Sequence, residues 1–147
     1  MAGESTSHIL SLEQLKPRQK FSLKKKVSES GVRRYAELSR DFNRLHLDEA
    51  YCSKTIFRSR ILHGMHLLGI AASAYPLNGV NSVALSYEAN FLKPARIDDE
   101  LLITREIVSV DLEKRRFSDK TEIRNSRGEL LVSISSTEKL LSDLMVK

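Results

Sequence analysis

The spacing of apolar residues changes along the chain, and the change divides it into a mainly helical half and a half made of strands. Apolar residues occupy every second position from Val83 to Phe91, which is the pattern of a strand with one buried face. Similar alternation predicts three more strands, over 101–110, 116–123 and 130–134, the last two joined by a turn at 125–128. Alternation over 21–27 predicts one earlier strand.

The segment from His63 to Tyr75 differs from all of these because it is apolar on nearly every side. Such a composition is typical of a helix that is buried all round. Pro76 is expected to end this helix, and Asn78-Gly79 predicts a turn directly after it.

One early strand, one buried helix and a series of antiparallel strands give an α+β order. A strongly curved antiparallel sheet wrapped around the central helix would cover it on all sides, an architecture called a hotdog. Because such a sheet has free edges, we expect two copies to pair as a homodimer. Residues 1–19 are polar and are expected to form a flexible N-terminal arm, which leaves 20–147 as the single hotdog domain.

The composition is that of one soluble domain, with 147 residues of which 41% are hydrophobic. Cys52 is the only cysteine, which excludes an internal disulfide and a multi-cysteine metal site. The longest apolar run is shorter than the roughly 20 residues that cross a bilayer. The first residues lack the basic and then apolar pattern of a signal peptide. We therefore expect a cytoplasmic protein that does not bind membranes.

Positive charge gathers in the first third of the chain, where residues 14–60 carry thirteen Lys or Arg against five Asp or Glu. A basic zone attracts phosphates and acidic proteins. Nucleic acid is disfavoured as a partner because the nine aromatic residues do not alternate with the basic ones, as a base-stacking surface requires.

Two candidate chemical groups lie in the irregular polar stretch 39–60, which predicts short helical turns. Asp41 and His46 are five residues apart, so they converge only if the chain turns between them, and Asn43 favours such a turn. An acid and an imidazole that meet at one water form a general acid–base pair. Spacing alone favours the alternative, in which Asp41 caps a turn and His46 is a structural histidine.

A second candidate group lies at the start of the buried helix. Free N–H groups at a helix N-terminus can hold an oxygen that becomes negative, and Gly64 would allow close approach. Tight packing explains the glycine equally well. His63 and His66 are weak evidence for a metal site without a third ligand, so no metal is expected. Cys52 has no neighbour that would make it a nucleophile.

Three separated segments resemble the MaoC-like (R)-specific enoyl-thioester hydratases and 3-hydroxyacyl-thioester dehydratases. The first, 35–50, resembles the hydratase-2 signature, whose matching residues here are Ser39, Asp41, Asn43, Leu45, His46 and Ala50. The second is 57–65, which opens the helix, and the third is 90–101, a strand that ends in Lys-Pro and an acidic turn. Arg40 replaces the glycine of the signature, and Arg44 replaces its proline.

The resemblance implies a lyase that hydrates trans-2-enoyl thioesters or dehydrates (3R)-hydroxyacyl thioesters. It implies that Asp41 and His46 are the catalytic pair, that Gly64 polarises the thioester carbonyl and that Asn43 orients the loop or the water. No metal or redox cofactor is implied, because coenzyme A or the phosphopantetheine of an acyl carrier protein only carries the substrate. Arginines of the basic zone are candidate contacts to that carrier, in particular Arg40, Arg44, Arg58 and Arg60.

Two other functions remain open from the sequence. A hotdog thioesterase would share the fold and the substrate class but would hydrolyse the thioester. A non-catalytic subunit that binds acyl carriers is suggested by Arg40 and Arg44 alone.

Overall fold

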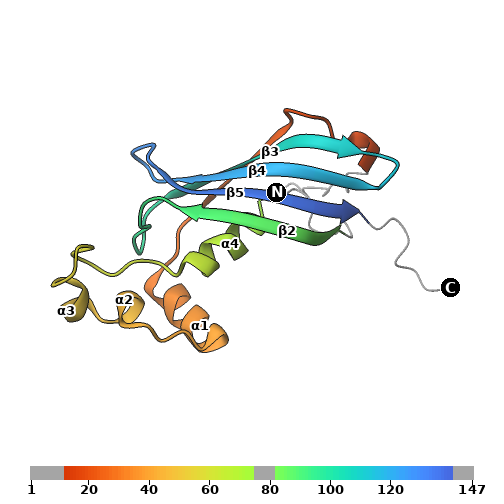
Figure 1. Ribbon diagram of the computed structural model, residues 1–147. Helices are drawn as coiled ribbons and strands as arrows, with labels where there is room; N and C mark the ends of the chain where they lie inside the picture. Colours follow the sequence, from red (N-terminus) through yellow and green to blue (C-terminus); the bar gives the residue numbers. More distant parts are fainter. Residues whose placement is uncertain (1–11, 75–81, 141–147) are drawn as a thin grey trace, which may run out of the picture.

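The computed structural model describes residues 12–74 and 82–140, which form one antiparallel sheet of five strands with helices packed on one face (Figure 1). The strands follow the order β1-β3-β4-β5-β2 across the sheet. Their bounds are β1 Lys20–Lys25, β2 Ser82–Phe91, β3 Leu101–Asp111, β4 Arg116–Arg124 and β5 Leu130–Leu140. All five strands predicted from the alternating pattern are therefore confirmed, and the α+β hotdog class is confirmed with them.

The helices lie mostly between β1 and β2 in the chain and cover one end of the same face of the sheet (Figure 1). Their bounds are η1 Leu12–Gln14, α1 Glu29–Ser39, α2 Arg44–Leu47, α3 Glu49–Cys52 and α4 Gly64–Ala72. The side chain of Ser28 caps α1 by accepting a hydrogen bond from the N–H of Gly31. The short helices α2 and α3 are the helical turns expected in the polar stretch.

The core forms where α4 meets the inward side chains of the sheet. Leu67, Ile70 and Ala71 of α4 are buried in one cluster with Ile103 of β3 and Ile134 of β5. Since every second strand residue points inward, the alternation seen in the sequence is what builds this layer.

The prediction that this helix is buried on all sides is wrong for the single chain. Met65 is 64% exposed, and Gly69 and Ala72 are exposed as well. The reason is that the sheet covers only one side of α4, while the opposite side of its first turns is partly covered by α1. The expected stop at Pro76 and the turn at Asn78-Gly79 lie outside the described residues.

The expectation of a flexible arm over 1–19 does not hold for the part that the structure describes. Leu12 and Leu15 are 1% and 4% exposed, and they pack in a second apolar cluster with Ile107, Phe117 and Leu140. This part of the chain is held to the sheet because two leucines three residues apart lie on the same side of the 3₁₀ turn.

The edge strand β2 differs from its predicted form in one detail. The register shifts between Ala84 and Ser86, so Tyr87 lies opposite the buried Ser136, while Val83 lies opposite Lys139. A bulge adds one residue to the strand and reverses which side chains face inward beyond it. The alternating apolar residues of this strand therefore do not all share one face, and most of them are exposed in the single chain.

No helix within the described ranges is long and apolar enough to span a membrane.

Candidate active site

The end of α1 presents Asp41 through a tight turn. Arg40 ends the helix in the left-handed conformation with φ of 62°, which bends the chain away from the helix axis. The hydroxyl of Ser39 accepts a hydrogen bond from the N–H of Asp41 at 3.2 Å and donates one to the carbonyl of Tyr35 at 2.7 Å. The carboxylate of Asp41 is consequently fixed at its base but exposed at its tip.

Asn43 turns the chain between Asp41 and His46. Its N–H donates to Asp41 Oδ1 at 3.1 Å, and its Oδ1 accepts from the N–H of Leu45 at 3.0 Å, which caps α2. This turn brings Asp41 Oδ2 to 4.0 Å from His46 Nε2. These contacts hold the turn together, and a role of Asn43 in orienting the loop or the water stays a prediction.

His46 is buried and held in one tautomer. Only 8% of its surface is exposed, and its Nδ1 lies 2.8 Å from the carbonyl oxygen of Ile61. A carbonyl can only accept, so Nδ1 carries the hydrogen, and Nε2 of the neutral ring has a free lone pair. That lone pair is on the side of Asp41, which is the arrangement that proton transfer from a water requires.

His46 and Gly64 line the same apolar cavity, which has a volume of about 380 Å³. Phe57, Leu67 and Phe91 also line it, whereas Asp41 contacts His46 but is not part of the lining. No side chain within 12–74 and 82–140 caps α4, so the first N–H groups of this helix are available to a ligand. A Cβ on Gly64 would lie 2.7 Å from Cε1 of Phe91, so any other residue here requires this ring to move.

His63 joins the site in a way that the sequence did not predict. Its Nε2 lies 3.1 Å from the main-chain oxygen of Asp41, and its ring stacks on His46 with centroids 3.8 Å apart. Asp41, His46 and His63 thus bring three metal-ligating atoms within 4.8 Å of one another. His66 stacks on Tyr35 at 4.5 Å, and the same ring makes an edge contact with His63 at 4.8 Å, so both histidines contact Tyr35 but only His63 belongs to the group of three. The only sequence signal for His63 was its place directly before the glycine that opens the helix.

Cys52 is a structural residue of the site, as expected. It is fully buried, and its thiol donates to the carbonyl oxygens of Arg44 and Leu45 at 3.4 and 3.3 Å. Burial raises the pKa of the Cys52 thiol, which keeps it protonated and unreactive.

Residues 12–127 match the family model described as "MaoC like domain". This chain belongs to the MaoC-like family. It is 32% identical to an (R)-specific enoyl-CoA hydratase from Aeromonas caviae over 89% of this chain and 99% of that protein. It is 35% identical to a 3-hydroxybutyryl-CoA dehydratase from Methylorubrum extorquens, over 64% of this chain and 61% of that protein. A solved (R)-hydratase structure from A. caviae covers 88% of this chain and 99% of its own, with 31% identity and a TM-score of 0.82.

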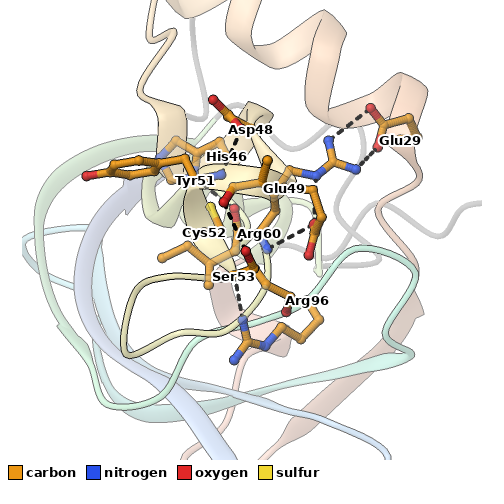
Figure 2. Close-up of polar contacts among 12 residues, drawn as sticks. Glu29, His46, Asp48, Glu49, Tyr51, Cys52, Ser53, Arg60 and Arg96 are labelled. Atoms are coloured by element: carbon orange, nitrogen blue, oxygen red, sulfur yellow. Dashed lines mark hydrogen bonds and ion pairs between the residues drawn. The ribbon is translucent and has the colours of Figure 1, made fainter.

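Two of the four arginines that were predicted as carrier contacts in this MaoC-like chain, Arg44 and Arg60, form ion pairs with acidic residues of the chain itself. Arg60 binds Glu29 and Glu49 through its guanidinium, with N–O distances of 2.5 and 3.3 Å, and only 17% of its side chain is exposed (Figure 2). This pairing lowers the pKa of Glu29 and raises that of Arg60. Arg60 therefore ties α1 to α3.

Arg44 is also engaged, since it binds Asp48 at 2.8 Å and lies over the ring of Tyr51. Among the described residues, no ion pair is recorded for Arg40 or Arg58, and both are exposed. A contact between these arginines and a carrier stays a prediction.

Proposed function

We propose that this protein adds water across the double bond of trans-2-enoyl thioesters to give (3R)-3-hydroxyacyl thioesters, and catalyses the reverse dehydration. The observation that carries the proposal is the 4.0 Å separation of Asp41 Oδ2 and His46 Nε2 beside the cavity that Gly64 lines. The relatives that share the family are hydratases and dehydratases, which are hydro-lyases.

The spacing of the two groups suits one water. A water at hydrogen-bond distances of about 2.8 Å from two atoms 4.0 Å apart makes an angle of about 90° at its oxygen, narrower than the tetrahedral angle but wide enough for both contacts. His46 Nε2 accepts one proton from this water, and Asp41 accepts a hydrogen bond from the other. The water oxygen then bonds to C3 of the enoyl group.

The electron pair of the double bond moves toward the thioester carbonyl as the water adds, so negative charge develops on that oxygen. In this proposal the N–H of Gly64, at the start of α4, donates to this oxygen, and the absence of a side-chain cap in the described residues supports the role. The enolate takes its proton at C2 from the imidazolium of His46, which restores the neutral base and balances the reaction. Acid, base and oxyanion donor all come from this chain, so this chemistry needs no metal or redox cofactor.

Coenzyme A is the proposed carrier, because both relatives named above act on coenzyme A thioesters by name. Arg40 and Arg58 are exposed and can meet its phosphates. Changing both to glutamate should raise KM for crotonyl-CoA more than KM for crotonyl-N-acetylcysteamine, and the difference should shrink with salt. An equal effect on both substrates would contradict a carrier contact.

A cytoplasmic location stays a prediction.

The proposed functional unit is a homodimer. The edge strand β2 exposes Val83, Leu85 and Tyr87 by 43%, 47% and 40%, and a free edge with apolar side chains favours pairing with another strand. Light scattering at micromolar concentration should give the mass of two chains, and Leu85→Lys should shift it toward one. A monomeric wild type would contradict the proposal.

The test of the activity uses crotonyl-CoA and 3-hydroxybutyryl-CoA. Loss of the enoyl absorbance with the first substrate, and its gain with the second, is expected. Release of free thiol would instead indicate a thioesterase, and no change with either substrate would indicate a binding protein.

A further inference from the structure

His63 is fully buried, with 1% of its surface exposed, and it precedes the first residue of α4. It does not line the cavity, and no step of the reaction above uses it. We propose that His63 is a positioning residue, which holds Asp41 through a hydrogen bond and His46 through ring stacking and so sets the distance between them. This inference rests on the proposed hydratase function.

The contact with Asp41 fixes the loop rather than the carboxylate. Nε2 of His63 lies 3.1 Å from the carbonyl oxygen of Asp41, which can only accept, so Nε2 carries the hydrogen. The donor sits at the start of a helix packed into the core, and the acceptor sits on an exposed turn. The hydrogen bond therefore transfers the rigidity of α4 to the residue that must hold the water.

The contact with His46 fixes the plane of the base. The two imidazole rings stack with centroids 3.8 Å apart and an angle of 28° between their planes. The hydrogen bond to Ile61 stops the His46 ring from rotating about its own axis, and the stack stops it from tilting. With both restraints, Nε2 can point in only one direction.

His63 must be neutral to do this, and its surroundings keep it so. Its Nδ1 is buried without a hydrogen-bond partner among the described residues, so a proton there would be left unsatisfied. Burial lowers the pKa of His63, and the neighbouring His46 lowers it further. Because the His63 ring is neutral, it does not repel the positive charge that His46 acquires when it accepts a proton. Tyr35 supports the far side of the ring with an edge contact at 4.8 Å.

The two contacts can be removed separately. His63→Phe keeps a ring to stack on His46 but loses the donor, whereas His63→Gln keeps an N–H donor of similar reach but loses the ring. His63→Leu loses both. Val32→Ala is the matched control, because Val32 is fully buried in the main core cluster and has no part in the site.

For crotonyl-N-acetylcysteamine we expect kcat of His63→Leu to fall on the order of 10²-fold, the effect of a displacement of about 1 Å. KM should stay within about twofold, because His63 does not line the cavity. The Phe and Gln variants should each recover part of kcat. Val32→Ala should lose stability while its kcat stays near that of the wild type.

A second readout does not depend on activity. In the wild type, NMR relaxation of the His46 ring carbons should show a rigid ring, and in His63→Leu a more mobile one, because the stacked ring that stops it from tilting is gone. Wild-type kcat in all three variants, or a fall in kcat no larger than that of Val32→Ala, would overturn the inference. A wild type that hydrates nothing would instead overturn the proposed function, and a His46 ring that is as rigid in His63→Leu as in the wild type would by itself overturn the positioning role.

Discussion

Arg40 occupies a backbone conformation that suits glycine, and replacing it with glycine should stabilise the protein. At φ of 62° the Cβ of an L-residue lies close to the following carbonyl oxygen, which costs about 1–2 kcal/mol. Glycine removes this cost but gives the unfolded chain more freedom, which returns about 0.4–1 kcal/mol. The net gain expected for Arg40→Gly is therefore about 0.5–1 kcal/mol in the free energy of unfolding.

The assay is urea unfolding of the wild type, Arg40→Gly and Arg40→Ala. Alanine removes the same charge but keeps the Cβ, so it should bring no gain, and the difference between the two variants isolates the backbone effect. The slope of the free energy against urea should be equal in all three, because the folded structure is unchanged. If Arg40→Ala is stabilised as much as Arg40→Gly, charge repulsion and not the left-handed backbone is the cause. If Arg40→Gly is less stable than the wild type, the reasoning is refuted.

Three further changes test other parts of the site. Gly64→Ala should lower kcat/KM by about tenfold or more, because the new methyl meets the ring of Phe91 at 2.7 Å, and Phe91→Ala in the same chain should restore part of the loss. Burial lowers the pKa values of His63 and His66 in the folded state. Below about pH 6.5 the unfolded state therefore binds more protons than the folded state, which lowers the stability. The urea concentration at half-unfolding should therefore decrease when the pH is lowered from about 7.5 to about 5.5, a range above that in which carboxylates titrate. Equal midpoints at the two pH values would contradict this. Dialysis against a chelator should leave the activity unchanged, and a loss that zinc restores would show that the three clustered ligands hold a catalytic metal.

The order of elements could be predicted because period-two alternation and an apolar helix each have a clear sequence signal. The bulge at Ala84 could not, since an inserted residue leaves the alternation of the sequence intact and alters only the pairing with β5. The exposed side of α4, including Met65, was missed for a related reason. A helix that is hydrophobic on all sides is expected to be buried, but its sequence does not show whether the residues that bury it belong to the same chain.

The candidate site could be predicted only as residue types in a familiar order. Asp41 and His46 were found because the resemblance named them, and the turn at Asn43 explains how they meet. The role of His63 depends on two contacts with residues 22 and 17 positions away in the chain, which no local pattern reveals. Arg60 was predicted to contact a carrier because the sequence shows its charge. The sequence does not show that Arg60 pairs with Glu29, which lies 31 residues away in the chain.

The most direct test of the central claim is the rate of crotonyl-CoA hydration by Asp41→Asn and His46→Gln, measured beside the wild type and the double variant. General acid–base groups contribute about 10²- to 10⁴-fold, so each single variant should lose at least about 10²-fold in kcat while keeping the wild-type unfolding midpoint. Because the two side chains act on one water, the double variant should be little slower than either single one. If either single variant keeps more than half of the wild-type rate, Asp41 and His46 are not the acid–base pair.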